Sequence, residues 1–255
     1  MPILEIKQVT RNFGGLTALK SVDIEVREGE ILGVIGPNGA GKTTLFSIIS
    51  GFIKPTSGEV LFRGQKMVGL KPEQIVKKGI VRTFQGTSNF AASSLLENIV
   101  IAHHLYKKKS FWQTMLNTKS YISREEEVIK ISTKMLESVN LADKKEAIAH
   151  EIPYGHQKLL GLAMALATNA PLLLLDEPVA GMNPEEVEIM AEKVRQIRDD
   201  QRKTIMLVEH NMKIAMGVCD RIVVLDHGEK IAEGAPEAIK TDPKVIGAYL
   251  GTDEI

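Results

Sequence analysis

The 255-residue sequence has little of three things that would place a chain in a specialised class: cysteine, net charge and long apolar runs. Its one cysteine, Cys219, cannot form an internal disulfide, which excludes a disulfide-stapled scaffold and fits a reducing compartment. Lys and Arg together number 32, as do Asp and Glu, so the formal net charge is zero. Because there is no overall basic field, no nucleic-acid partner is expected.

The longest apolar passage, Leu159–Leu175, is interrupted by Thr168 and Pro171 and falls short of the ~20 apolar residues that a membrane span needs. Its pattern is typical of a buried helix followed by a buried strand. The first residues, Met1–Glu5, contain no basic segment followed by a long apolar stretch, so no signal peptide is expected. Any connection with a membrane therefore has to come through a partner.

The remaining composition, 44% hydrophobic and 25% charged residues, is ordinary for a globular protein. Segments Leu4–Val9 and Val22–Val26 alternate apolar and polar residues, which predicts antiparallel strands. From about residue 94 to residue 169, Lys, Glu and other helix formers dominate. We therefore expect a single α/β domain over residues 1–255, in which residues 1–93 and 170–255 form the core with an antiparallel β subdomain and residues 94–169 form a helical subdomain.

One short stretch, Gly36–Thr43, fits the phosphate-binding pattern G-x-x-x-x-G-K-[ST] at every fixed position. The apolar run Ile31–Ile35 before it predicts a buried strand, and Thr44–Ile49 after it predicts a helix. In that context backbone amides and the helix N-terminus cradle phosphates. The residues expected to bind ATP here are Gly36, Pro37, Asn38, Gly39, Ala40, Gly41, Lys42, Thr43 and Thr44, with Lys42 reaching the β- and γ-phosphates and the Thr43 hydroxyl ligating Mg²⁺.

A second apolar run, Leu172–Leu175, ends in the carboxylates Asp176 and Glu177. Such a run is typical of a strand buried on both faces, and its carboxyl end is where ligands bind in open α/β sheets. Beside a phosphate-binding loop, Asp176 is expected to hold Mg²⁺ through water, and Glu177 is expected to polarise the attacking water.

Three further residues each permit two interpretations from the sequence alone. Phe13, in a Gly-flanked turn, either stacks on a nucleotide base or caps the small sheet. Gln85, at the end of a predicted strand, either reaches Mg²⁺ or the attacking water, or lies on the surface. His210 follows the buried strand Thr204–Val208, where a lone histidine is more often structural than catalytic.

The phosphate-binding loop, Gln85, Asp176-Glu177 and His210 occur in an order that resembles ATP-binding cassette (ABC) ATPases. Within that family the chain most resembles the ATP-binding subunits of branched-chain amino acid importers, from about Leu4 to Gly251. The segments that carry this resemblance are Arg11–Ala18, Val81–Gln85, the stretch from Gln85 to Ile152, Asp176–Pro184, Glu209–Met212 and Ala248–Gly251.

The resemblance implies roles that the residues alone leave open. Phe13 would stack on adenine with Ala18 near the ribose, Gln85 would join the metal site to a transmembrane partner, and His210 would contact the γ-phosphate. Gly181–Asn183 would form a loop that crosses between two cassettes. Each ATP would lie between the phosphate-binding loop of one subunit and the signature motif of the other.

The signature motif departs from the family pattern, which reads Leu-Ser-Gly-Gly-Gln or Leu-Ser-Tyr-Gly-Gln-Gln. The corresponding residues here are Ile152, Pro153, Tyr154, Gly155, His156 and Gln157, of which the last five are expected at the nucleotide. Pro153 replaces the serine whose hydroxyl would bond the γ-phosphate. Proline suits the start of a helix, so the helix is expected to persist without that donor.

The sequence therefore predicts the ATPase subunit of an importer, acting at the cytoplasmic face of a membrane on branched-chain amino acids or a related small polar solute. Its cofactors would be ATP and Mg²⁺. Its partners would be a second cassette (identical or paralogous), two membrane permease subunits and, indirectly, a solute-binding protein. The alternatives are an importer of urea or short amides, and a soluble cassette ATPase that drives assembly or remodelling.

Overall fold

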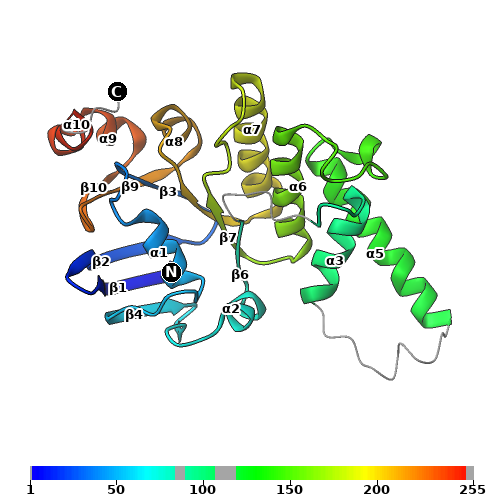
Figure 1. Ribbon diagram of the computed structural model, residues 1–255, viewed down its shortest axis with the longest axis horizontal. Coiled ribbons are helices and arrows are strands. Elements are labelled where there is room, and N and C mark those ends of the chain that lie inside the picture. Colours follow the sequence, from blue (N-terminus) through cyan, green and yellow to red (C-terminus); the bar gives the residue numbers. More distant parts are fainter. Residues whose placement is uncertain (1, 84–89, 107–118, 251–255) are drawn as a thin grey trace. The chain divides into compact units, whose positions relative to one another are not determined.

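The computed structural model describes residues 2–83, 90–106 and 119–250, and within these residues the chain divides into two compact units (Figure 1). Unit 1 comprises residues 1–82, 171–178 and 194–255, and unit 2 comprises residues 83–170 and 179–193. The sequence-based boundaries at residues 94 and 169 stay a proposal for how the domain divides.

Unit 1 contains two sheets. A four-stranded antiparallel sheet has the order β2-β1-β4-β5 and a six-stranded sheet has the order β10-β9-β3-β8-β7-β6. In the six-stranded sheet, β9, β3, β8, β7 and β6 run parallel, and β10 pairs antiparallel with β9. The strands are β1 (Pro2–Phe13), β2 (Leu16–Arg27), β3 (Ile31–Ile35), β4 (Ser57–Phe62), β5 (Gln65–Lys66), β6 (Ile80–Arg82), β7 (Leu172–Asp176), β8 (Thr204–Val208), β9 (Arg221–Asp226) and β10 (Glu229–Gly234).

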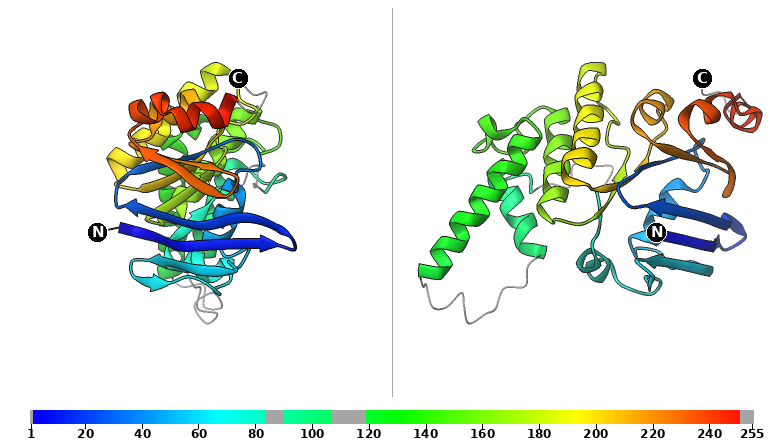
Figure 2. Two further views of the ribbon diagram at one scale, coloured as in Figure 1. Left: turned by 90° about the vertical axis from the view of Figure 1, so that its left-hand side faces the viewer. Right: turned by 180° about the vertical axis from the view of Figure 1, so that it is seen from behind.

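Helix α1 (Lys42–Ile49) lies between the two sheets, and side chains from both sheets and from α1 form one apolar core (Figure 1). Every residue of β3, β7 and β8 is buried, as expected for strands covered on both faces. Figure 2 shows that α8 (Met212–Val218), α9 (Pro236–Thr241) and α10 (Pro243–Leu250) lie on the other side of the six-stranded sheet. The short helix α2 (Pro72–Lys78) precedes β6.

Unit 2 is helical, as the sequence predicted for most of this stretch. Helix α3 (Leu95–Tyr106) packs against α5 (Lys119–Ser138) and α6 (Tyr154–Ala167), and a 3₁₀ turn, η1 (Ala142–Lys144), lies between α5 and α6. Helix α7 (Pro184–Gln201) begins in this unit, and its last turns belong to unit 1. Among the described residues no helix is both long and apolar enough to cross a bilayer.

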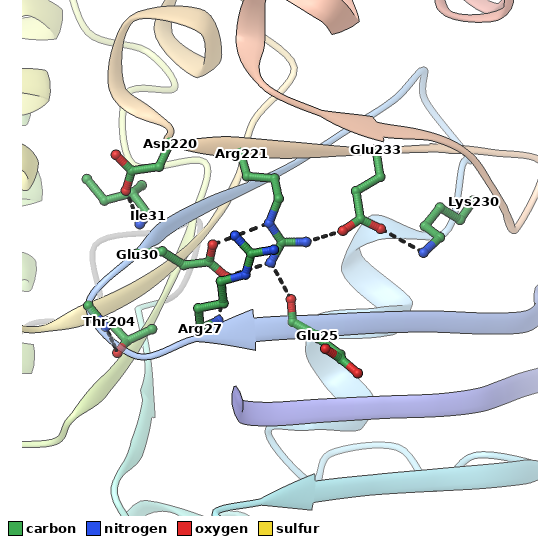
Figure 3. A network of polar contacts seen from close by, with 10 residues as sticks. Glu25, Arg27, Glu30, Ile31, Thr204, Asp220, Arg221, Lys230 and Glu233 are labelled. Carbon is green, nitrogen blue, oxygen red and sulfur yellow. Dashed lines mark hydrogen bonds and ion pairs between the residues drawn. The ribbon is translucent and has the colours of Figure 1, made fainter. Parts of the chain in front are cut away.

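A network of charges ties the strands of unit 1 together near the start of β3 (Figure 3). Its centre, Arg221 and Glu30, is largely buried, whereas Glu233 and Lys230 are exposed. The Arg221 guanidinium donates to both carboxylate oxygens of Glu30, at 2.6 and 3.3 Å, and also pairs with Glu233. Lys230 Nζ lies 2.7 Å from Glu233, and the Glu25 carbonyl accepts a bond from Arg221. The network therefore joins β2 of the four-stranded sheet to β9 and β10 of the six-stranded sheet. It lies at the start of β3, whereas Gly36 follows the end of β3.

This network predicts a stability change on acidification. Burial alone would raise the pKa of Glu233, but its bonds and charge contacts with Lys230 and Arg221 outweigh burial and leave that pKa below its usual value of 4.5. A lowered folded-state pKa stabilises the protein above the unfolded-state pKa, and the stabilisation is lost as pH falls through the folded-state value. We expect Glu233→Gln to cost about 1 kcal/mol of unfolding free energy at pH 7.

Urea denaturation at pH 7 and at pH 4 or below checks this expectation, because the difference between wild type and Glu233→Gln should shrink at acid pH. The exposed Glu237, in the first turn of α9, provides the control Glu237→Gln. A difference between wild type and Glu233→Gln that does not change with pH would show that the carboxylate does not stabilise through its charge.

Candidate nucleotide-binding site

The phosphate-binding loop of unit 1, Gly36–Thr43, follows β3 and ends in the first turn of α1. Gly36 and Gly41 have φ values of 150° and 101°. A Cβ on Gly36 would lie 2.0 Å from the Leu225 carbonyl oxygen, and one on Gly41 would lie 2.5 Å from the Ala18 carbonyl oxygen. Only glycine fits these two positions, so neighbouring strands set the path of the loop.

Lys42 folds back over this loop. Its Nζ donates to the carbonyl oxygens of Gly36 at 2.6 Å and Pro37 at 2.9 Å, and the residue is only 7% exposed. Helix α1 has no side-chain cap and no acidic residue in its first turn. The positive end of the helix and the Lys42 ammonium therefore favour an anion at this position. Thr43 is exposed and Thr44 half-buried in the same turn, while Asn38 and Gly39 are exposed in the loop.

Asp176 and Glu177 lie at the carboxyl end of β7, as predicted. Asp176 is buried and pairs in register with Val208 of β8. Glu177 has a φ of 47°, an uncommon value for a residue other than glycine, and its amide donates to the Val208 carbonyl. A strained backbone held by its neighbours is often found at functional sites.

His210 follows β8 and faces the same edge. Its Nδ1 lies 3.8 Å from Glu177 Oε1, and its side chain is 56% exposed compared with 16% for Glu177. The preceding residue, Glu209, is fully buried, and its amide donates to the Val34 carbonyl in β3. Because β3, β8 and β7 are neighbouring parallel strands, their carboxyl ends bring together four residues: Lys42, Asp176, Glu177 and His210.

Sequence reasoning assigned no role to Arg82, the last residue of β6. Arg82 Nη2 donates to Asp176 Oδ2 at 2.7 Å, and both side chains are at least nine-tenths buried. Arg82 Nη1 donates to the hydroxyls of Ser47 in α1 and of Ser50, the residue that caps the C-terminus of this helix. The only sequence signal is an arginine that ends an apolar strand. The consequence is that Arg82 holds the Asp176 carboxylate against the helix that carries Lys42.

We expect Arg82→Met to lower the unfolding free energy by about 3 kcal/mol, because it removes a guanidinium that is paired with the buried Asp176 carboxylate. The matched control is Arg63→Met, which removes an exposed pair with Glu28 and should cost less than about 1 kcal/mol. Urea denaturation measures both. Adding Asp176→Asn to Arg82→Met should recover part of the loss, and strictly additive losses would contradict this assignment.

Phe13 and Ala18, predicted near the base and ribose, both lie on the β1–β2 hairpin. Phe13 is 41% exposed, and the Arg11 guanidinium lies 4.4 Å from its ring centroid. One face of the ring is therefore in contact with Arg11. The Ala18 carbonyl lies against Gly41, as described above. Gln85, predicted to reach the metal, lies outside the described residues.

The altered signature motif lies at the start of α6 in unit 2. The helix begins at Tyr154, directly after Pro153, so the helix persists as predicted. Pro153 provides no side-chain cap, and the Gln157 side chain donates to the Ile152 carbonyl. His156 Nδ1 lies 3.3 Å from Lys144 Nζ, and burial followed by this neighbouring ammonium lowers the pKa of His156. His156 therefore favours its neutral form.

Within unit 2 the loop Gly181–Asn183 lies beside this helix start. A Cβ on Gly181 would lie 3.0 Å from the Tyr154 ring, and one on Gly155 would lie 2.3 Å from Glu186 Oε1. Glu186 also accepts a bond from the Asn183 amide. The loop predicted to cross between cassettes and the signature helix are thus packed together in one chain.

Comparison with known proteins decides the family to which this arrangement belongs. The family described as ABC transporter matches residues 19–180. The chain belongs to this family. A second family, described as branched-chain amino acid ATP-binding cassette transporter, matches residues 229–255 of the cassette.

Individual relatives agree with this assignment. The cassette is 40% identical over 250 residues to the high-affinity branched-chain amino acid transport ATP-binding protein LivG of Escherichia coli, covering 98% of each chain. It superposes with a TM-score of 0.86 on a solved ABC transporter cassette in its ADP conformation, at 31% identity over 99% of this chain and 100% of that chain. A dimeric cassette solved with ADP and phosphate gives a TM-score of 0.77 at 26% identity, covering 91% and 98%. The predicted family, fold and ATPase class are confirmed.

Proposed function

We propose that this chain is the ATP-hydrolysing subunit of an importer that takes up branched-chain amino acids. The observation that carries the proposal is that Lys42, Asp176, Glu177 and His210 lie together at the carboxyl ends of neighbouring parallel strands. The chain that holds them is similar to LivG over 98% of its length. Urea, short amides and related small polar solutes are the competing substrates of an importer of this kind.

In this proposal Lys42 and the amides of Gly36–Thr43 bind the phosphates, and Phe13 and Ala18 border the base and ribose. Glu177 accepts the proton of the attacking water. His210, whose Nδ1 lies 3.8 Å from Glu177 Oε1, would contact the γ-phosphate. Because ATP hydrolysis needs little covalent chemistry from the protein, positioning and charge supply most of the rate enhancement.

The residues present fit a magnesium ion held together with phosphates. Among the described residues there is no cage of three or more His, Cys, Asp or Glu side chains. Mg²⁺ does not need one, since it is usually bound by one or two carboxylates plus substrate phosphates. Asp176 and the Thr43 hydroxyl would hold it, with Gln85 as the third predicted ligand. When bound, the ion would neutralise charge on the phosphate oxygens.

The second face of the ATP site is proposed to come from another cassette, identical or paralogous, through its signature motif. In return, Pro153, Tyr154, Gly155, His156 and Gln157 of this chain would face the partner's nucleotide. The dimeric relative bound to ADP and phosphate supports this arrangement. The site that uses this chain's signature would lack the serine hydroxyl.

Pro153→Ser is therefore expected to raise ATP turnover at that site about tenfold, since a hydrogen bond to a charged group is worth about 1.5–3 kcal/mol. Pro153→Ala is the matched control, because it removes the ring without adding a hydroxyl, and it should give no gain. Steady-state phosphate release from the assembled complex measures both. An unchanged rate for Pro153→Ser, or equal gains for the two variants, would show that the missing hydroxyl does not limit turnover.

The importer proposal also requires membrane partners: two permease subunits and, through them, a solute-binding protein outside the membrane. The chain would then act peripherally at the cytoplasmic face. Co-expression with the membrane subunits, followed by purification from membranes, tests this. We expect co-purification and an ATPase rate that rises in the complex. A chain that stays soluble without a partner would instead favour a cassette ATPase that drives assembly or remodelling.

A further inference from the structure

Two hairpin turns in unit 1 have nearly the same backbone. In the β9–β10 turn, His227 and Gly228 have φ values of 46° and 81°, and in the β4–β5 turn, Arg63 and Gly64 have φ values of 48° and 74°. Two successive positive φ values are typical of the tight turns that join antiparallel strands. Both turns therefore require a positive φ at their glycine, Gly228 or Gly64.

The surroundings of the two turns differ sharply. A Cβ on Gly228 would lie 2.8 Å from the Ala18 carbonyl oxygen and 3.1 Å from the Leu19 Cα, both backbone atoms. A Cβ on Gly64 would meet nothing within 4 Å. The β9–β10 turn is thus pressed against β2, whereas the β4–β5 turn has open space at the corresponding position.

The β9–β10 turn also contacts the phosphate-binding loop. The Gly228 amide donates to the Ala40 carbonyl at 3.2 Å, and the Gly228 carbonyl accepts a bond from the Lys20 amide at 2.8 Å. The two strands beside this turn restrict the ends of the phosphate-binding loop. Leu225 in β9 lies against Gly36, and Ala18 in β2 lies against Gly41. The middle of the loop is therefore held by the turn, and its ends are held by the strands beside that turn.

We propose that the β9–β10 turn, Asp226–Gly228, is part of the nucleotide site, and that Gly228 is a positioning residue for the phosphate-binding loop. The loop amides can bind phosphates only when the backbone around Ala40 keeps its conformation. Gly228, which lies outside the loop, stabilises that conformation through its bond to the Ala40 carbonyl. The match to the branched-chain family begins at the next residue, Glu229, so the turn also joins the loop to that C-terminal segment. This inference rests on the proposed ATP-binding function.

The experiment compares Gly228→Ala with Gly64→Ala by calorimetric titration with MgADP, which avoids turnover. Both variants place alanine at a positive φ and should lose similar stability from that strain. Only Gly228→Ala must move the turn away from β2 and weaken its bond to Ala40. We expect its MgADP Kd to rise about threefold to tenfold, and the Kd of Gly64→Ala to stay at the wild-type value.

Equal Kd values for wild type and Gly228→Ala would overturn the inference, as would an equal loss of affinity in Gly64→Ala. If the wild-type chain itself fails to bind MgADP or MgATP, the proposed function fails instead. Should Gly228→Ala not fold, hydrogen exchange of the wild-type chain provides the second measurement. MgADP should slow exchange of the Gly228 amide and leave the Gly64 amide unchanged, and no difference between them would contradict the proposal.

Discussion

Glu177→Gln is expected to reduce the kcat for ATP hydrolysis at least about hundredfold while leaving the Kd for ATP within about twofold of wild type, because a positioned general base contributes about 10²–10⁴ to a rate. The substitution keeps the size and the backbone position of the residue. It removes the carboxylate that is proposed to accept the proton of the attacking water and that lies 3.8 Å from His210 Nδ1. Phosphate release and equilibrium ATP binding, measured on the same preparation, separate the two effects.

The control for this substitution is Glu73→Gln, at an exposed acidic residue in the first turn of α2. It makes the same chemical change in unit 1 away from the phosphate-binding loop, and it should leave both kcat and Kd unaltered. If Glu177→Gln retained more than about a tenth of the wild-type rate, general-base catalysis by Glu177 would be wrong.

Lys42→Met is expected to weaken ATP binding at least about tenfold and to abolish measurable turnover, since each hydrogen bond from a charged donor is worth about 1.5–3 kcal/mol. Methionine preserves the buried aliphatic stem and removes the ammonium. In the structure that ammonium donates to the Gly36 and Pro37 carbonyls, so the variant also leaves two loop oxygens without this donor.

Titration of Lys42→Met with MgATP measures the loss, and thermal unfolding without nucleotide measures the separate effect on the loop. The control is Lys66→Met, at a surface lysine that pairs with Glu59 and whose side chain is 75% exposed. That control should bind ATP as the wild type does. Retention of wild-type affinity by Lys42→Met would place the phosphates somewhere other than this loop.

Much of the fold could be predicted because its signals are local. The mainly apolar runs at 31–35, 172–175 and 204–208 lie in buried parallel strands, and the alternating segments near residues 4 and 22 lie in paired antiparallel strands. The phosphate-binding pattern specifies its own strand, loop and helix. Each of these signals needs only neighbouring residues, so no knowledge of distant contacts was required.

What the sequence could not predict depends on partners far along the chain. The Arg82–Asp176 pair joins residues 94 positions apart, and the bond from Gly228 to Ala40 joins residues from opposite ends of unit 1. The positive φ of Glu177 and the contact of Arg11 with one face of Phe13 also have no sequence pattern. The roles of the site residues therefore stay predictions, although the sheet brings the main ones together.

The most direct test of the central claim is uptake of labelled leucine by proteoliposomes that contain this chain, its membrane subunits and the solute-binding protein. Uptake should require MgATP, should be reduced by unlabelled isoleucine and valine but not by urea or short amides, and should vanish with Glu177→Gln. Leucine uptake that proceeds equally with Glu177→Gln, or ATP-driven uptake blocked by urea or amides and not by branched-chain amino acids, would contradict the account.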